Sequence, residues 1–342
     1  MNKRVIITGI CGQDGFWLTK MLLQMGYEVH GMIRRHNYGF LDYLPKEMLA
    51  KIHFHLVDVT DKFAVDTAIR IAKPNEIYHF AAFSSVRHSW TNPELAFSTD
   101  TLGTLNILES VRQTCHWDTK IFFPGSSEMF GNPPESPQTL QTPFNPVSPY
   151  GIAKLAAFNL CRSYRDAYKM FIALAVPYNH DSAYRSADFV MRKIALAAVK
   201  ISRGEQDMLQ LGDLDAQRDF SHAHDVVRGY YQMMQEPESI ECLFASGETH
   251  SIREICEIAF NLMGIPLVWE KPSNTLSEVG INETTRKPVI GVTYEHFRPT
   301  KSTVRLCGNA VETRRKLNWA PEKKFCQIIE EMVKFDLAQE AK

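Results

Sequence analysis

The stretch RVIITGICGQDG, residues Arg4–Gly15, decides how the chain folds. Its residues VIIT are all β-branched, which is typical of a buried strand. Three glycines follow at the spacing G-x-x-G-x-x-G and open a predicted helix over Gln13–Met25. Glycines let the backbone turn tightly and approach a pyrophosphate, whose charge is stabilised at a helix N-terminus. Three glycines alone are a weak signal, but this strand–turn–helix order predicts a dinucleotide-binding site at Gly9, Gly12 and Gly15.

Strand-like segments alternate with helical ones through the first half of the chain. Further strands are predicted at Tyr27–Ile33, His53–Val59, Glu76–Ala82, Lys120–Ser126 and Phe171–Pro177, with clear helices at Glu94–Gln113 and Pro149–Tyr168. Near-continuous apolar strands separated by helices are typical of a parallel sheet covered on both faces. We therefore expect an α/β fold built on a Rossmann-like, doubly wound parallel sheet.

The alternation becomes irregular after Pro177. Helical patterns at Phe189–Arg203, His222–Gln235 and Ser251–Met263 are separated by polar, loop-like stretches. We expect a dinucleotide-binding domain over residues 1–178, with segments near 219–248 returning to it. Residues 179–342 would then form a smaller, mostly C-terminal α/β domain for the substrate.

Composition excludes several classes of protein. The net charge is −1 over 342 residues, so no electrostatic attraction to nucleic acid or an anionic membrane is expected. The seven cysteines are scattered without a CxxC pair, which favours neither a disulfide framework nor a zinc site. The apolar start leads into a glycine turn rather than a signal peptide, and no stretch is long enough to span a membrane. We expect a cytoplasmic protein without a metal ion.

The end of the second predicted strand bears on which dinucleotide binds. NAD sites usually place an acidic residue there to bind the ribose 2′-hydroxyl, whereas this chain has Arg34 and Arg35. Guanidiniums suit a 2′-phosphate through charge-assisted hydrogen bonds, so NADP is favoured over NAD. A solvated basic loop is the alternative. Further cofactor contacts are expected from Gln13, Asp14, Asp58, Val59, Ala81, Ala82 and Ser84.

Tyr150 and Lys154 suggest the chemistry. They are four residues apart and share one face of the predicted helix. An ammonium beside a phenol lowers the tyrosine pKa from about 10, and such a tyrosine can accept a hydroxyl proton near neutral pH. YxxxK occurs often by chance, but here it follows the glycine motif and a strand ending in Ser126. Tyr150 and Lys154 would also contact the cofactor.

With these motifs the chain resembles the extended short-chain dehydrogenases/reductases, and more narrowly the GDP-mannose 4,6-dehydratase family. The resemblance covers nearly the whole length, through GICGQDG, YEVHGMIRR, SSEMFG, SPYGIAK, NHDSAYR, LGDLDAQRDFSHAHD and KLNW. It implies NADP, a GDP-linked sugar as substrate, and a homodimer or homotetramer.

The resemblance also assigns a role to Glu128. Oxidation of a sugar hydroxyl needs only Ser126, Tyr150 and Lys154. A carboxylate at Glu128 is explained if the proton on carbon 5 must be removed and the hydroxyl of carbon 6 lost as water. The alternative is a helix-capping or surface carboxylate.

Other positions are assigned by the resemblance alone. It implies cofactor contacts for His180 and Arg185. Substrate contacts are implied for Ser85, Ser126, Glu128, Asn179, Lys193, Arg218 and Arg298. Each of the three cations among them has an ordinary surface residue as its alternative.

Departures from the family pattern fall on the sugar and nucleotide side. Phe83, Ser85 and Lys301 stand where glutamine, histidine and glutamate are usual. The reaction type is therefore better determined than the sugar, which is mannose, a heptose or an N-acetylated hexosamine. Two rival functions are a nucleotide-sugar 4-epimerase, which would not need Glu128, and a non-catalytic NADP-binding protein of the same fold.

Overall fold

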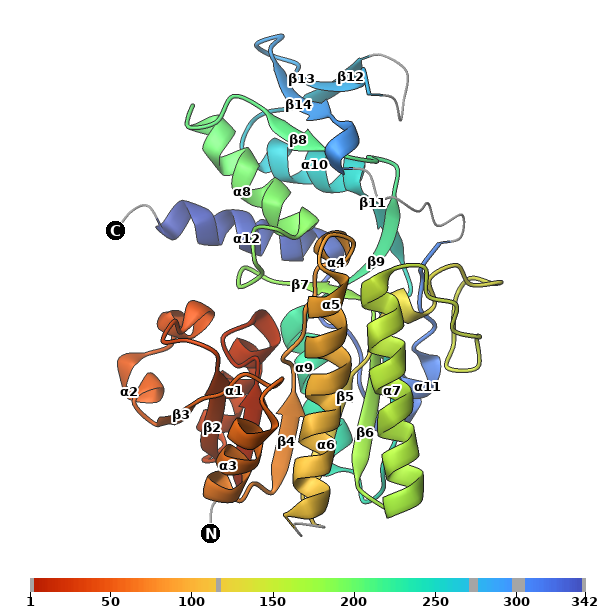
Figure 1. Cartoon of the computed structure of the whole chain (residues 1–342). Helices are drawn as coiled ribbons and strands as arrows, with labels where there is room; N and C mark the ends of the chain where they lie inside the picture. Colours follow the sequence, from red (N-terminus) through yellow and green to blue (C-terminus); the bar gives the residue numbers. More distant parts are fainter. Residues whose placement is uncertain (1–2, 115–117, 271–275, 297–304, 340–342) are drawn as a thin grey trace.

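A seven-stranded parallel sheet lies at the centre of the larger lobe (Figure 1). The computed structural model describes residues 3–114, 118–270, 276–296 and 305–339. The strand order is β10-β6-β5-β4-β1-β2-β3. The bounds are β1 (Arg4–Thr8), β2 (Glu28–Ile33), β3 (Ile52–Leu56), β4 (Glu76–His79), β5 (Lys120–Pro124), β6 (Ile172–Pro177) and β10 (Glu241–Phe244). The doubly wound parallel sheet expected from the sequence is confirmed.

The order of the strands reverses between β1 and β4, both of which pair with neighbours in parallel. In open α/β sheets such a reversal leaves a crevice at the carboxyl ends of the strands, where ligands bind. The glycine turn follows β1, and the segment Phe80–Ser85 follows β4. The fold therefore brings these two segments to the same crevice.

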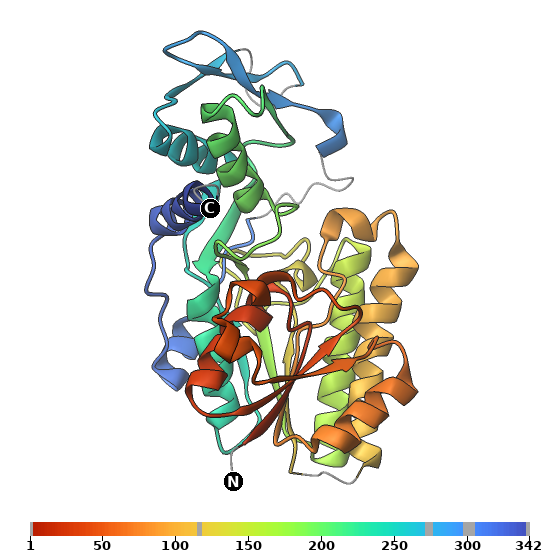
Figure 2. The same ribbon diagram turned by 90° about the vertical axis from the view of Figure 1, so that its left-hand side faces the viewer.

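Helices cover both faces of the sheet (Figure 2). One layer consists of α1 (Gln13–Gln24), α9 (Ala223–Gln235) and α11 (Val311–Leu317). The other consists of α3 (Lys62–Ala72), α6 (Gly103–Gln113) and α7 (Pro149–Tyr168). Shorter helices are α2 (Lys46–Leu49), α4 (Val86–Ser89) and α5 (Pro93–Ala96).

The predicted helix over Glu94–Gln113 is interrupted. Its first turn is α5, which begins at a proline, and it then widens into a π-helical segment over Phe97–Leu102 before α6. Single π-helical turns within helices frequently occur at functional sites. Here the wider turn carries the buried Asp100.

The smaller lobe has its own hydrophobic core, centred on residues such as Ile194, Phe260 and Ile329. Its helices are α8 (Val190–Ser202), α10 (Ile252–Leu262) and α12 (Phe325–Gln339). They pack with a sheet of β7 (Asn179–Asp181), β9 (Gln217–His222) and β11 (Thr249–Ser251), and a sheet of β8 (Leu209–Leu211), β12 (Leu267–Glu270), β13 (Val279–Asn282) and β14 (Pro288–Val292). Within the described ranges, no helix is both long and apolar enough to cross a membrane.

Candidate active site

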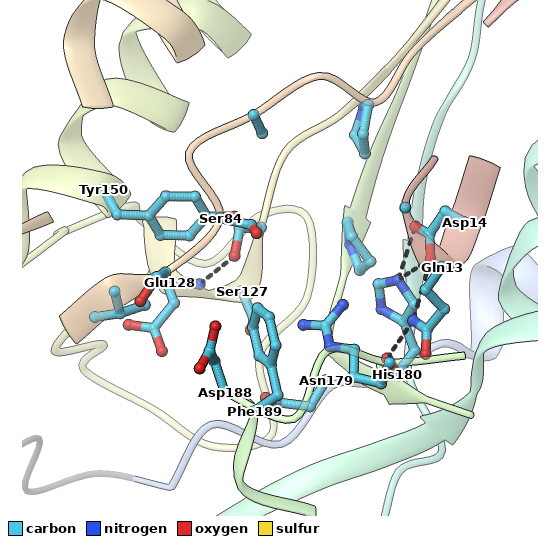
Figure 3. A pocket seen from close by; sticks show the side chains of 18 of the residues that line it. Gln13, Asp14, Ser84, Ser127, Glu128, Tyr150, Asn179, His180, Asp188 and Phe189 are labelled. Atoms are coloured by element: carbon cyan, nitrogen blue, oxygen red, sulfur yellow. Dashed lines mark hydrogen bonds and ion pairs between the residues drawn. The ribbon is translucent and has the colours of Figure 1, made fainter. Parts of the chain in front are cut away.

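A cavity of about 420 Å³ lies at the carboxyl edge of the large sheet, lined by residues of both lobes. Figure 3 shows side chains from the α1 start, the β5 end, α7 and the β7–α8 segment pointing into it. Most of the residues expected from the sequence line this cavity: Gly9, Gly12, Gln13, Asp14, Gly15, Ala82, Ser84, Ser85, Ser126, Glu128, Tyr150, Lys154, Asn179, His180, Arg185 and Lys193.

The glycine turn leaves no room for side chains. Gly9 has φ +65°, and a Cβ there would lie 2.7 Å from the amide nitrogen of Ala81. A Cβ on Gly15 would lie 2.4 Å from the carbonyl oxygen of Ile10. No side chain caps the start of α1 after Gly12, so N–H groups of its first turn are left for an anion. These features fit a dinucleotide pyrophosphate.

An ion pair ties this turn to the smaller lobe. His180 Nδ1 lies 2.8 Å from the carbonyl oxygen of Tyr178, and its Nε2 lies 3.0 Å from Asp14 Oδ2. Both partners only accept hydrogen bonds, so both ring nitrogens must donate and the imidazole is charged. Burial by itself lowers the pKa of His180, but the Asp14 carboxylate outweighs it and the pKa is raised. Burial likewise opposes the ionised form of Asp14, yet His180 keeps the pKa of that carboxyl below its usual value.

Neutral hydrogen bonds reinforce the same junction. Gln13 donates to the carbonyl oxygen of His180 at 3.0 Å and accepts from the hydroxyl of Ser182 at 3.0 Å. The indole N–H of Trp17 in α1 donates to the same hydroxyl at 3.1 Å. The first turn of α1 and the segment around β7 are therefore held as one unit.

The proposed acid–base pair lies on α7. Ser148 caps this helix through the amide of Gly151, and Tyr150 and Lys154 are both buried in it. The expected lowering of the Tyr150 pKa is wrong for the ligand-free chain. Burial raises the pKa of Tyr150, Asp100 and Glu128 add to the rise, and the hydrogen bond from Ser126 only partly opposes it.

Lys154 interacts electrostatically with the buried Asp100. Burial lowers the pKa of Lys154, and the Asp100 carboxylate opposes that effect. The Lys154 ammonium also lies 4.3 Å from the centroid of the Phe123 ring. Spacing on a helix showed that Tyr150 and Lys154 share a face, but not which neighbours each would have.

Asp100 was missed by the sequence analysis. One of its oxygens accepts from the amide of Phe83 at 2.6 Å, and the other has no hydrogen-bond partner among the described residues. Burial raises the pKa of Asp100 to about 6, with Lys154 opposing the rise. No sequence motif indicated this residue, because it lies on a π-helical turn that forms where the helix packs against α7.

Ser126 and Glu128 lie where β5 gives way to a 3-10 helix over Ser127–Met129. The Ser126 hydroxyl accepts from the amide of Glu128 at 3.2 Å. A Cβ on Gly151 would lie 2.6 Å from the Glu128 carbonyl oxygen, so this segment lies directly against the start of α7. Glu128 and Tyr150 consequently point into the same part of the cavity (Figure 3).

A second carboxylate, Asp188, faces Glu128 across this space in Figure 3. Asp188 is an exposed residue of the loop before α8, and sequence analysis gave no signal for it. Other lining residues missed in the sequence include Arg87, Trp90, Phe189, Tyr230 and His296.

Some expected cofactor residues lie outside the cavity lining. Arg34 and Arg35 are exposed at the end of β2, two and three residues beyond Met32, which pairs with Thr8 of β1. The Asp58 carboxylate accepts from the amide and hydroxyl of Thr60. Val59 is buried beside Gly103, and the Ala81 amide donates to the Thr8 hydroxyl.

Two expected substrate residues also lie elsewhere. Arg218 belongs to β9, outside the cavity lining, where its guanidinium donates to the Gln217 carbonyl at 2.7 Å. Arg298 lies outside the described residues, as does Lys301.

One grouping of possible metal ligands occurs in the described part of the chain, away from this cavity. His222, His224 and Asp225 have ligand atoms within 4.8 Å of one another. His222 also lies 3.3 Å from Glu331, and Asp225 accepts from the amides of Glu322 and Lys323. These contacts join the start of α9 to the C-terminal segment.

Sequence comparisons show which known proteins the chain resembles. The family model described as GDP-mannose 4,6 dehydratase matches residues 6–332. A GDP-mannose 4,6 dehydratase of Cricetulus griseus is 38% identical, with 98% of this chain and 92% of the relative covered. A GDP-mannose 4,6-dehydratase of Sinorhizobium fredii is also 38% identical, with 98% and 97% covered.

Solved structures support the fold. A UDP-glucose 4-epimerase of Thermus thermophilus, solved with NAD, has a TM-score of 0.78 at 23% identity, with 98% of this chain and 99% of that chain covered. The protein RMD of Pseudomonas aeruginosa, solved with NADPH, has a TM-score of 0.76 at 20% identity, with 99% of each chain covered. From the family model and the curated relatives together, the chain belongs to the GDP-mannose 4,6-dehydratase family.

Proposed function

We propose that the protein is an NADP-dependent GDP-sugar 4,6-dehydratase, a lyase that forms a 4-keto-6-deoxy sugar. The observation that carries the proposal is the position of Glu128, whose carboxylate shares one space with Tyr150 beside the glycine turn. The family match supports the same reaction. A 4-epimerase is not favoured, because it has no use for a proton acceptor at Glu128.

The first step in this proposal is oxidation at carbon 4. The phenolate of Tyr150 accepts the proton of the carbon 4 hydroxyl, and the Ser126 hydroxyl donates to the same oxygen. A bound NADP would supply the hydride chemistry, as acceptor from carbon 4 and as donor to carbon 6. Burial raises the pKa of Tyr150. The proposal requires the bound ligands to lower this pKa, which the pH dependence of oxidation tests.

The second step is elimination, and it needs Glu128. The new ketone acidifies the proton on carbon 5, which the Glu128 carboxylate removes and delivers to the departing hydroxyl of carbon 6 as water. Once a hydride has been supplied to carbon 6, Tyr150 transfers to carbon 5 the proton that it took from the carbon 4 hydroxyl. Every proton and the hydride are accounted for.

We assign the glycine turn, Ala81, Ala82, Ser84, His180 and Arg185 to the cofactor, with residues 1–178 and 219–248 as its domain. The exposed Arg34 and Arg35 support NADP over NAD, since no carboxylate stands at the end of β2. The solved relatives named above hold NAD in one case and NADPH in the other.

The smaller lobe is assigned to the nucleotide sugar. Asn179 and Lys193 line the cavity on this side, and Arg218 and Arg298 remain proposals from the resemblance. The curated relatives are named for GDP-mannose. The changed positions Phe83 and Ser85 keep a heptose or an N-acetylated hexosamine as alternatives.

The decisive experiment uses Glu128→Gln, which keeps size and hydrogen bonding but accepts no proton. With GDP-mannose, and in parallel the GDP-linked heptose and N-acetylhexosamine, we expect product to fall by about 10²- to 10⁴-fold while bound NADPH absorbance accumulates slowly. Wild-type product made in deuterated solvent should carry deuterium at carbon 5. Mass spectrometry distinguishes water loss from an isobaric epimer.

Tyr150→Phe is the matched control, because it removes one hydroxyl and blocks the earlier step. We expect turnover to fall by at least ~10²-fold without NADPH build-up. Formation of product by Glu128→Gln at the wild-type rate would make Glu128 structural and remove the main support for the dehydratase.

We also propose a homodimer or homotetramer. Leu95, Leu102 and Ile152 are 43%, 54% and 45% exposed on the adjoining α5, π-helical and α7 segments, which is unusual for apolar side chains unless another surface covers them. Light scattering tests this by comparing the mass of the wild type with that of Leu102→Glu, which should dissociate. A monomeric wild type would contradict the proposal.

A further inference from the structure

We propose that Arg87, His296 and Lys193 form a cationic clamp that holds a phosphate of the substrate's diphosphate between the two lobes. The inference rests on the proposed function for the identity of the ligand. The clamp itself rests on contacts that join separate elements at one end of the cavity.

The three side chains come from three elements and meet inside the cavity. Arg87 belongs to α4 of the larger lobe, and its Nη1 lies 2.9 Å from His296 Nδ1. His296 ends the 3-10 helix over Tyr294–His296 of the smaller lobe, and its Nε2 lies 3.4 Å from Lys193 Nζ. Lys193, on the first turn of α8, also donates to the Gln210 carbonyl oxygen at 2.7 Å. All three line the cavity.

Among the described residues, no carboxylate forms an ion pair with Arg87 or Lys193, the two cations of this cluster. By contrast, Arg192, the residue before Lys193, is paired with Asp336. Because Arg87 donates to Nδ1 of His296, the hydrogen of the neutral ring sits on Nε2 and faces the Lys193 ammonium.

The electrostatics of each group agree with an excess of positive charge. Burial lowers the pKa of Lys193, and Arg87 adds to the effect. Burial also lowers the pKa of His296, as do Lys193 and Arg87, while Glu295 opposes them. A phosphate placed among these groups would reverse the repulsion, and a guanidinium offers it paired donors.

The layout of the cavity indicates which phosphate this is. The glycine turn and the uncapped start of α1 serve the cofactor pyrophosphate, and they lie on a different element. Glu128 and Asp188 line the reacting part, where carboxylates would repel an anion but accept hydrogen bonds from a sugar. The anionic part of the nucleotide sugar therefore fits at Arg87, His296 and Lys193, with the neutral sugar toward Tyr150.

The test compares ligands that differ only in phosphate. Calorimetry measures the binding of GDP, guanosine and inorganic pyrophosphate to the wild type and to Arg87→Gln. We expect Arg87→Gln to weaken GDP by about 10- to 30-fold, the usual size for a charge-assisted contact, while guanosine changes less than about 2-fold. Lys200→Gln, on α8 but outside the cavity lining, removes one charge as a control and should leave GDP affinity within about 2-fold.

His296 gives an independent readout. Since a bound phosphate would raise its pKa, GDP binding near pH 7 should take up a proton, measured from titrations in two buffers of different ionisation enthalpy. His296→Gln should abolish that uptake. Arg87→Lys keeps the positive charge but loses the paired N–H donors of the guanidinium, so it should bind GDP with intermediate affinity.

The outcomes separate the clamp from the proposed function. The clamp is overturned if Arg87→Gln binds GDP like the wild type, or if GDP and guanosine weaken equally. If pyrophosphate binds the wild type but not Arg87→Gln while no GDP-sugar is turned over, the clamp stands and the dehydratase proposal fails. If the wild type turns over GDP-mannose and Arg87→Gln has the same KM for it, the dehydratase proposal is supported and the clamp is overturned.

Discussion

Two groups of charged side chains that line the cavity are arranged in opposite ways. At the glycine turn, Asp14 and His180 are mostly covered and form an ion pair, and each ring nitrogen of the histidine has an acceptor. In the second group, Arg87 and Lys193 both approach the imidazole of His296, and neither cation forms an ion pair with a carboxylate among the described residues. The first arrangement is complete in the folded chain, whereas the second becomes balanced only when an anion binds. The difference separates charges that the protein itself balances from charges that the proposed anion would balance.

The proposed catalytic residues include both balanced and unbalanced polar groups. Lys154 and Asp100 are both buried and influence each other, yet one oxygen of Asp100 has no hydrogen-bond partner in the described ranges. Such a group costs stability in the folded protein, which is common where chemistry requires an unusual pKa.

The largest expected effect comes from breaking the Asp14–His180 ion pair. Asp14→Ala leaves His180 without its counter-charge, and we expect the free energy of unfolding to fall by about 3–5 kcal/mol in urea titrations. Asp14→Asn should cost less, because a neutral His180 can accept from the amide. Equal losses for the two variants would show that the charge of Asp14 does not matter.

The same pair predicts a pH window. The raised pKa of His180 contributes stability that is full below about pH 6.5 and is lost as pH rises through its folded value. The lowered pKa of Asp14 contributes stability above about pH 4 that is lost at more acidic pH. The difference between wild type and Asp14→Ala should therefore be greatest between about pH 4 and 6.5.

The second effect tests the cofactor rather than the fold. Replacing Arg34 and Arg35 together by alanine should cost about 2–4 kcal/mol of NADP binding, because two charge-assisted contacts with the 2′-phosphate are lost. NAD binding should not change, since both side chains are exposed. Equal affinity of the wild type for the two dinucleotides contradicts the assignment.

The third expected effect is an increase in the free energy of unfolding rather than a loss. Asp100→Asn keeps the acceptor for the Phe83 amide and removes a buried charge whose pKa is raised from 3.8 to about 6. An acid with a raised folded pKa destabilises the protein above that value, so the variant should be more stable by about 2–3 kcal/mol at pH 8. The gain should shrink as pH falls from 6 toward 4, measured by urea unfolding at each pH.

Turnover provides the control for this variant. Lys154 loses the carboxylate that supports its charge, so we expect Asp100→Asn to be slower although it is more stable. A variant that is both more stable and fully active would show that Asp100 has no part in the reaction.

The smallest effect concerns the sugar side. Asp188→Asn retains size and one acceptor, so we expect KM for the GDP-sugar to rise by about 3- to 10-fold with kcat within about 2-fold. GDP affinity should stay the same, because the Asp188 carboxylate faces Glu128 (Figure 3) and is proposed to contact the sugar. Tighter GDP binding would place the diphosphate beside Asp188 instead.

Much of the fold could be predicted because its signals are local. The β-branched runs and glycines of β1 and α1 determine a strand, a turn and a helix within a few residues of each other, and the structure confirms them. Strand ends were predicted less well. The strand expected over Glu76–Ala82 stops at His79, because the chain there leaves the sheet toward the cavity.

By itself, the sequence determined the sheet, the glycine turn and the presence of Ser126, Glu128, Tyr150 and Lys154 in recognisable motifs. Only the tertiary structure decided the electrostatic surroundings of these groups. Arg87 and His296 are 209 residues apart in sequence, and the π-helical Asp100 acts electrostatically on Lys154 of another helix. Burial and opposing charges depend on such distant neighbours, which is why the pKa of Tyr150 moved in the direction opposite to the one its helix spacing predicted.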